Sequence, residues 1–209
     1  MRLKVDGVNH NQPIAEQFAF GVVDATTHVK LGANRNPGLS WDSLPDNTRS
    51  LVLVCVDSDV PTKPDDVNQE NRLVPADLPR ANFYHWVMVD IPPTTGGLKE
   101  GECSNGVTPG GKDNPPGPAG SRQGLNDYTG WFEGDADMGG QYFGYDGPCP
   151  PWNDSIVHHY HFVLYATDLG RCPVEGAFTG ADVERALEGH VLSEVQITGT
   201  YTLNPDISP

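Results

Sequence analysis

Two aspartates separated by one residue follow the most apolar stretch of the chain. The stretch is LVLVCV at residues 51–56, and DSDVP continues from it at residues 57–61. Residues two apart in an extended strand project to the same side, so Asp57 and Asp59 are predicted to line one cavity. Pro61 is predicted to end the strand, because it has no amide hydrogen to pair. The competing interpretation is an ordinary turn, which Asp and Ser also favour.

A histidine lies within an aromatic stretch, FYHWVMV, that begins at residue 83. Strand alternation predicts that His85 shares one face with Phe83 and Val87. The residues between them, Tyr84 and Trp86, then face the other way. A single histidine in such a strand is more often a hydrogen-bonded core residue than a ligand contact, so its functional interpretation depends on other polar residues that converge on it.

The third candidate segment joins a proline-rich stretch to a strand with three histidines. Its first part, GPCPP at residues 147–151, is predicted to form a rigid wall, because each proline fixes its backbone and removes a donor. After the turn NDS, alternation places His158 and Tyr160 on one face of the strand. His159 and His161 lie on the other face, where packing or exposure is the simpler interpretation.

Hydrophobic patterning predicts the elements that must position these residues. Glycine (24) and proline (19) are frequent, which favours strands joined by structured loops over long helices. Strands are predicted at residues 51–56, 83–91, 158–166 and 190–203, with weaker ones at 3–5 and 18–23. The strand at 51–56 is apolar on both faces, so we expect it to lie centrally in a sheet that is covered on each side.

Only one helix is predicted, between a capping residue at Thr179 and a stop at Gly189. Two long segments, 62–82 and 96–144, carry no clear regular element. Segments of that length inside a compact domain usually indicate function or packed excursions.

Length and charge restrict the class of protein. A chain of this size can bury one sizeable core, so a single domain over residues 1–209 is expected. The net charge of -15 opposes nucleic acid and bulk membrane surfaces as partners. No apolar run approaches the roughly 20 residues that cross a bilayer, and the first ten residues lack the apolar centre of a signal peptide. These features predict a cytoplasmic protein.

Four scattered cysteines do not indicate a disulfide framework. They are Cys55, Cys103, Cys149 and Cys172. Cys55 is predicted to be a small buried core residue, because it lies inside the apolar run.

Taken in order, the motifs resemble the signatures of phosphatidylethanolamine-binding proteins, also called Raf kinase inhibitor-like proteins. They are DSDVP (57–61), YHWVMVDIP (84–92) and YDGPCPPWNDSIVHHYHFVLYATD (145–168). GANRNPGLSW (32–41) and HVLSEVQITGTYTL (190–203) resemble the entry to the core and the closing strand of that family. The similarity runs from about residue 18 to 203 and fits the bacterial and archaeal branch best.

The resemblance implies a mainly β fold, a sandwich of two antiparallel sheets with one short C-terminal helix and long structured loops. It also implies a small pocket near one sheet edge that holds phosphate, acetate or phospholipid head groups such as phosphoethanolamine. The pocket positions of the family fall on Asp57, Asp59, Pro61, His85, Tyr145, Gly147, Pro150, Pro151, His158 and Tyr160.

The sequence departs from the family pattern in three places. Ser58 stands where a proline is usual, His159 replaces a frequent arginine, and the wall has an extra residue around Cys149 and Trp152. The two long segments exceed those of compact members, so they are expected to cover either the pocket or a surface that shorter relatives use for partners.

Two carboxylates disfavour an anion, so histidine must supply the attraction. If Asp57 accepts a hydrogen bond from one ring nitrogen of His85 or His158, the imidazole pKa rises and the other N–H faces the ligand. Amides near Gly147 could add donors. The sequence therefore predicts a binding protein rather than an enzyme, without a cofactor, for a phosphate monoester or similar small anion, tightest at mildly acidic pH.

Three alternatives use the same residues. Two Asp and two His could hold Zn, Mn or Fe, although no compact metal motif is present. Ser58 could form a hydrolase relay with His85 or His158, although it lies in no G-x-S-x-G turn and the flanking aspartates oppose an oxyanion. The third is an interaction protein that restrains a kinase or protease. No residue identifies that partner, and a homodimer is left open.

Overall fold

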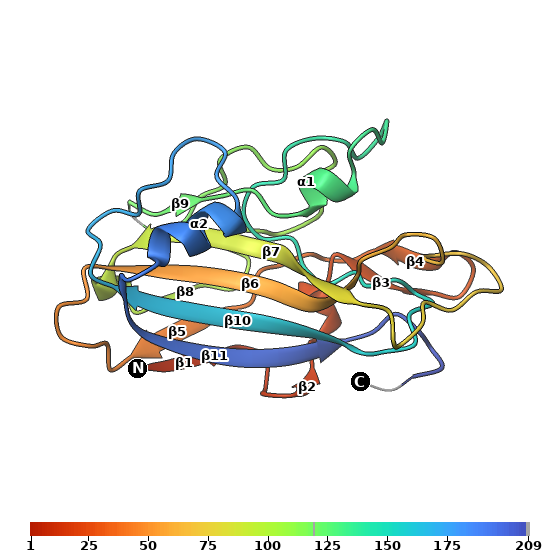
Figure 1. The fold of residues 1–209 in the computed structure, drawn as a ribbon, viewed down its shortest axis with the longest axis horizontal. Helices are drawn as coiled ribbons and strands as arrows, with labels where there is room; N and C mark the ends of the chain where they lie inside the picture. The colour runs from red at the N-terminus through yellow and green to blue at the C-terminus, as the bar shows by residue number, and fades with distance from the viewer. Residues whose placement is uncertain (119, 208–209) are drawn as a thin grey trace.

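Four long strands rich in β-branched and aromatic residues form the middle of a six-stranded sheet (Figure 1). They are β6 (Ser50–Pro61), β7 (Arg80–Ile91), β10 (His158–Thr167) and β11 (Val191–Tyr201), bordered by β2 (Gln12–Pro13) and β9 (Arg122–Gln123). The order is β2–β11–β10–β6–β7–β9, antiparallel except for β2 with β11. The computed structural model describes residues 1–118 and 120–207. The four strong strand predictions are confirmed.

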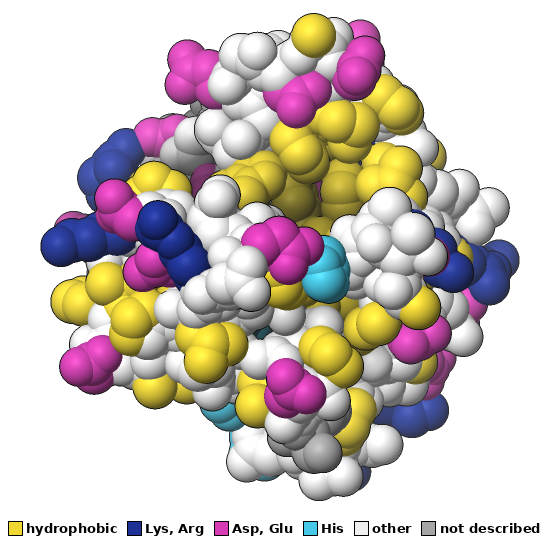
Figure 2. Space-filling model, turned by 90° about the vertical axis from the view of Figure 1, so that its right-hand side faces the viewer, with side chains coloured by type: hydrophobic (Ala, Val, Ile, Leu, Met, Phe, Trp, Pro, Cys, Tyr) yellow, Lys and Arg dark blue, Asp and Glu magenta, His cyan; other side chains and the backbone are white. Residues whose placement is uncertain are grey.

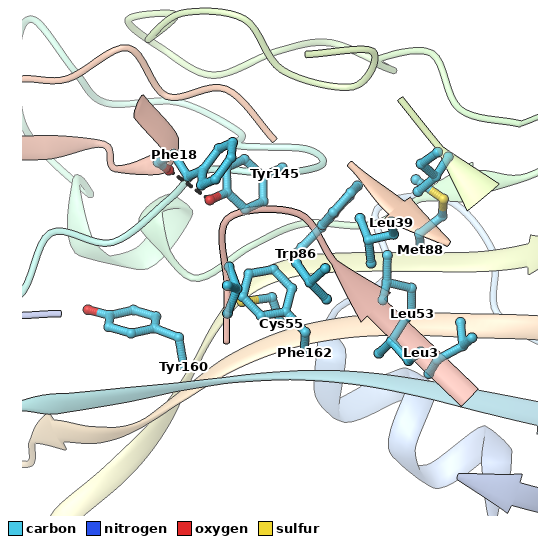
Figure 3. Close-up of a cluster of buried hydrophobic side chains, with 14 of the residues drawn as sticks. Leu3, Phe18, Leu39, Leu53, Cys55, Trp86, Met88, Tyr145, Tyr160 and Phe162 are labelled. Atoms are coloured by element: carbon cyan, nitrogen blue, oxygen red, sulfur yellow. Dashed lines mark hydrogen bonds between the residues drawn. The ribbon is translucent and has the colours of Figure 1, made fainter. Parts of the chain in front are cut away.

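A smaller sheet packs on one face of the large one and completes a sandwich. It consists of β1 (Arg2–Val5), β5 (Leu39–Asp42) and β8 (Gly97–Leu98). Figure 3 shows side chains of both sheets in one cluster, with Leu3 and Leu39 from the small sheet beside Leu53 and Phe162 from the large sheet. The predicted sandwich is therefore confirmed, and a separate hairpin of β3 (Gly21–Asp24) and β4 (His28–Leu31) lies beyond it.

The central strand β6 is buried on both faces, as its apolar sequence predicts. Val52 and Val54 face away from the small sheet and pack in a cluster with Val183 and Leu187. The last two belong to α2 (Gly180–Leu187), which lies against this face in Figure 1. The hydroxyl of Thr179 accepts from the Asp182 amide and caps the helix, so the predicted helix is confirmed.

The long segments contain short elements that hydrophobic periodicity does not reveal. In the segment 96–144 these are β8, β9 and the one-turn helix α1 (Tyr128–Trp131). Two 3-10 turns, η1 (Glu16–Phe18) and η2 (Pro93–Thr95), lie outside the long segments. No helix among the described residues is long and apolar enough to cross a membrane. All four cysteines are free, and Cys55 is buried as predicted.

Two irregularities in the pairing of β6 with β7 determine which side chains face the site. His85 has no partner on β6, because Tyr84 pairs with Val56 and Trp86 with Cys55. A second register shift lies between Asp57 and Val60 on β6. An extra residue in one strand bends it and re-aims the side chains that follow, so simple alternation fails at both points.

Candidate ligand-binding cavity

A cavity of about 450 Å³ opens where β6, β7 and β10 meet the long segments. Figure 2 shows a hollow in this end of the molecule with hydrophobic side chains around it. Its lining residues are Phe20, Leu31, Asp57, Val60, Pro61, Pro64, Val67, Asn68, Phe83, His85, Tyr128, Trp131, Phe132, Cys149, Pro150, Pro151, His158 and Tyr160. Both long segments contribute to this lining. Of the two roles expected for them, covering the pocket or covering a partner surface, the first is therefore confirmed.

Most of the sequence-predicted positions come together here. The cavity is lined by Asp57, Pro61, His85, Pro150, Pro151, His158 and Tyr160, whereas Asp59, Tyr145 and Gly147 are not among its residues. The buried polar side chains of Asp57, His85, His158 and Tyr160 form what we call the polar base of the cavity.

The prediction that Asp59 faces the cavity beside Asp57 is wrong. The Asp59 carboxylate accepts hydrogen bonds from the amide and the Nδ1 of His159, each at 2.8 Å. The register shift after Asp57 supplies the reason, since it breaks the alternation that would bring the two carboxylates to one side. Asp59 instead supports the site through its amide, which donates to Asp57 Oδ1.

Tyr145 and Gly147 are buried in the protein and do not line the cavity. The Tyr145 hydroxyl donates to the Phe18 carbonyl at 2.7 Å, and its ring packs edge-on against Trp86, as Figure 3 shows. The Gly147 amide donates to Asn34 Oδ1 at 2.8 Å, so it is not available to a ligand. A Cβ at Gly147 would lie 1.8 Å from the Phe18 carbonyl oxygen, so the backbones approach too closely for any side chain.

His158 lies between two buried carboxylates. Its Nδ1 is 2.7 Å from Asp57 Oδ2, and its Nε2 is 3.1 Å from Asp154 Oδ2. Arg80 continues the chain of charges, because its two terminal nitrogens donate to the two oxygens of Asp154 at 2.6 and 3.0 Å. We call these four residues the ion network.

The ion network holds His158 in its charged form. Burial alone lowers the pKa of His158, but the charges and hydrogen bonds of Asp57 and Asp154 outweigh burial and raise it to about 9. With both nitrogens carrying hydrogens, each can donate to a carboxylate. Two negative and two positive groups then sum to zero, so the base is not an uncompensated negative site. Of the two histidines that the sequence offered as partners of Asp57, it is His158 that bonds this carboxylate. Its second nitrogen does not face a ligand, because Asp154 accepts from it.

His85 is the open counterpart of His158. Its Nδ1 lies 2.8 Å from the Asp146 carbonyl, which can only accept, so this nitrogen carries the hydrogen. Burial lowers the pKa of His85 despite the opposing charge of Asp57 and the Asp146 hydrogen bond. Among the described residues no hydrogen-bond partner meets Nε2, which is therefore available to a molecule in the cavity.

The prediction that Val87 shares the face of His85 is wrong, because Val87 packs with the α2 cluster beyond the bulge.

Tyr160 supplies a second free polar atom at the base. It pairs with Asp57 across β10 and β6 and is fully buried, as strand alternation from His158 predicts. Its hydroxyl has no hydrogen-bond partner among the described residues. Burial raises the pKa of Tyr160 well above its ordinary value, so the hydroxyl keeps its hydrogen and can donate.

Two carboxylates that hold the site together were not predicted. Asp146 is buried, and its carboxylate accepts from Asn34, Asn126 and Lys112. Its amide donates to the His85 carbonyl, and its own carbonyl accepts from His85 Nδ1. Asp146 lies between Tyr145 and Gly147, which the family resemblance places at the pocket, so the YDG motif already pointed to this position. Asp154 lies in a turn, where an aspartate is ordinary, and nothing in the sequence relates it to Arg80.

The metal and hydrolase alternatives do not assemble from these residues. In the described part of the chain, no three His, Cys, Asp or Glu side chains gather in a way that could hold a metal ion. Ser58 contacts His161 Nε2 at 3.0 Å and does not line the cavity, so it forms no relay with His85 or His158.

The sequence is similar to those of several known proteins. The family model described as phosphatidylethanolamine-binding protein matches residues 5–202. A UPF0098 protein of Methanothermobacter thermautotrophicus is 36% identical over 170 residues, which cover 81% of this chain and 84% of that protein. The UPF0098 protein YbcL of Escherichia coli is 28% identical over 197 residues, or 92% and 87% of the two chains.

Solved structures agree on the fold. The crystal structure of Escherichia coli YbcL, described as a member of the mammalian PEBP family, aligns with a TM-score of 0.65 and 22% identity over 96% of this chain and 97% of that one. The PEBP homologue CT736 of Chlamydia trachomatis aligns with a TM-score of 0.63 and 24% identity over 95% of each chain. The chain therefore belongs to the phosphatidylethanolamine-binding protein family.

Proposed function

We propose that the cavity binds a small anion, a phosphate monoester or a carboxylate, whose head group lies against His85 and Tyr160. The observation that carries this proposal is a pair of polar atoms on residues that line the cavity. The Tyr160 hydroxyl is buried without a hydrogen-bond partner among the described residues, and His85 bonds the protein through Nδ1 alone, which leaves its Nε2 for a ligand. Buried polar atoms are normally hydrogen-bonded, so free ones that line a cavity are positioned to bond a ligand. The family name supports a phospholipid head group, and phosphoethanolamine carries such a phosphate.

The ion network removes the electrostatic objection to an anion at this place. The charge of Asp57 is offset by His158 at 2.7 Å, so an incoming anion does not meet a bare carboxylate. His85 then acts as the variable group. In its neutral form Nε2 is an acceptor, and on protonation it becomes a charged donor to the ligand.

Proton uptake by His85 should therefore accompany anion binding. Because its pKa is lowered by burial, the charged form is scarce at neutral pH and grows as the pH falls. We expect the affinity for acetate, phosphate and phosphoethanolamine to rise by up to about tenfold for each pH unit that is lowered towards that pKa.

Isothermal titration calorimetry at pH 5.5 and pH 8 tests this proposal. The matched variant is His85→Asn, whose side-chain amide can still donate to the Asp146 carbonyl but cannot titrate. We expect it to bind the anions weakly and equally at both pH values. Equal affinity of the unaltered protein at pH 5.5 and pH 8 would show that histidine does not supply the attraction.

Restraint of a kinase or protease stays a prediction that rests on the resemblance alone. The cytoplasmic location, the absence of nucleic-acid and bulk-membrane partners, and the open question of a homodimer also stay predictions.

A further inference from the structure

Aromatic side chains form one wall of the cavity above the polar base. The rings of Phe20 and Tyr128 are stacked at 4.5 Å with an interplanar angle of 18°, and those of Tyr128 and Phe132 at 5.6 Å and 14°. Phe83 meets Tyr128 edge-on at 5.2 Å. All four line the cavity, and we call them the aromatic wall. The four rings therefore pack on one another in stacked and edge-on geometry along one contiguous part of the lining.

The cavity is much larger than the head group proposed for its base. A phosphate has five heavy atoms, which fill at most about 150 Å³ even at the ~30 Å³ that a water molecule takes in the liquid. Roughly two-thirds of the 450 Å³ then remains, and apart from Asn68 the residues around it are apolar. A ligand that filled the cavity would need an apolar body attached to its polar head.

Two large apolar side chains stand exposed at the rim. Trp131 is 48% exposed and Leu31 is 57% exposed, and both line the cavity. They come from separate elements, α1 and β4, so they border the opening from different parts of the chain. A bound apolar group would cover surface that is otherwise in contact with water.

We infer that the aromatic wall is a subsite for a planar aromatic ring, and that the ligand is an aryl phosphate or aryl carboxylate with its anionic head on the polar base. This inference rests on the proposed function for the head group and assigns the rest of the molecule. An alkyl chain would gain only from burial, whereas a ring also gains from offset-stacked and edge-on contacts. That difference corresponds to about threefold to tenfold in affinity.

Calorimetry at pH 5.5 with three anions tests the inference on the unaltered protein. The probes are inorganic phosphate, n-hexyl phosphate and phenyl phosphate, the last two having six carbons each. We expect phenyl phosphate to bind about threefold to tenfold more tightly than hexyl phosphate, and both to bind more tightly than inorganic phosphate. If inorganic phosphate binds, then hexyl phosphate binding as tightly as phenyl phosphate, or phenyl phosphate binding no better than inorganic phosphate, would overturn the aromatic subsite.

The variant Phe132→Leu separates ring contacts from burial. Leucine keeps an apolar side chain at this position but removes a ring that stacks on Tyr128. We expect the preference for phenyl over hexyl phosphate to shrink while hexyl phosphate affinity stays the same. As a control, Leu192→Ala alters an exposed apolar side chain on β11, away from the cavity, and should leave the preference intact. An unchanged preference in Phe132→Leu would contradict the subsite.

A neutral probe distinguishes failure of this inference from failure of the proposed function. 4-Ethylphenol has a ring but no anionic head. If it binds while all three phosphates do not, the aromatic subsite stands and the anion proposal falls. If phosphate binds and phenyl phosphate gains nothing over it, the anion proposal stands and the subsite falls. If no probe binds, both are wrong.

Discussion

The polar base of the cavity has two sides, each built around a buried histidine. On one side His158 donates to Asp57 and Asp154, and Arg80 completes a neutral network of four charges. On the other side His85 has a carbonyl on Nδ1 and no protein partner on Nε2. The same type of side chain is thus charged and closed on one side, and neutral and open on the other.

The neighbours, rather than burial, produce this difference. Burial lowers the pKa of both histidines, and only His158 has carboxylates on both nitrogens to reverse that effect. The His158 side of the base therefore stabilises the fold, and the His85 side is the one proposed to contact the ligand.

Replacing each histidine by asparagine should separate stability from binding. His158→Asn leaves two buried carboxylates without their shared cation, and loss of one partner from a buried ion pair costs about 3–5 kcal/mol in the free energy of unfolding. His85→Asn retains the donor to Asp146 and should cost about 1 kcal/mol. Urea denaturation followed by circular dichroism measures both. Similar losses of unfolding free energy in the two variants would contradict a structural role for His158 that His85 does not share.

The free energy of unfolding should fall as the solution becomes alkaline. Below the unfolded-state pKa of about 6.5 both states bind the His158 proton, so its contribution is fully present. Between there and the native pKa of about 9 the unfolded chain releases this proton while the native protein keeps it, and stability falls with rising pH. Over this pH range the free energy of unfolding should fall by about 3 kcal/mol.

Urea midpoints at pH 6.5, 8 and 9.5 measure this slope. His158→Asn serves as the control, since it removes the titrating group and should flatten the dependence over the same window. A flat profile for the unaltered protein would mean that His158 gains no proton affinity on folding.

Tyr160→Phe should affect binding more than stability. The hydroxyl is buried without a partner, so its removal should leave the free energy of unfolding unchanged or raise it by about 1 kcal/mol. The affinity for phosphate should fall about fivefold to tenfold, because one donor is lost. Thermal denaturation and calorimetry on the same sample give both numbers. A destabilised variant with normal phosphate affinity would place Tyr160 in the structural half of the base.

Asp59→Asn should have the smallest effect. Its carboxylate pairs with His159, whose side chain is 45% exposed, and ion pairs in such surroundings contribute about 0–1 kcal/mol. The amide that supports Asp57 is retained in the variant. Urea denaturation should show a loss below about 1 kcal/mol, and a loss as large as that of His158→Asn would contradict the placement of Asp59 outside the network.

The sequence predicted the fold well because long apolar and aromatic strands dominate it. The strands around Leu53, Val87 and Phe162 and the helix capped by Thr179 follow patterns that local chemistry determines. The one-turn helix at Tyr128 escaped prediction because four residues are too short to show helical periodicity.

The site was predicted less completely because two bulges and two tertiary ion pairs define it. Strand alternation fails at Asp59 and at His85 because a bulge lies at each place, and no local sequence pattern predicts these bulges. Arg80 and Asp154 lie 74 residues apart, so only the fold brings them together. The motif that contains Tyr145 and Gly147 does belong to the family pattern. In the structure these two residues bond Phe18 and Asn34, and they thereby hold the segment that carries Asp146.

Nuclear magnetic resonance of ¹⁵N-labelled histidine side chains tests the central claim most directly. The account predicts that His158 keeps hydrogens on both ring nitrogens until the pH approaches about 9. His85 should be neutral at pH 7, with its hydrogen on Nδ1, and should gain a proton on Nε2 when phosphate is added. Titration of both histidines together near their ordinary pKa, with no response of His85 to phosphate, would contradict the division of the base into a structural and a ligand-binding side.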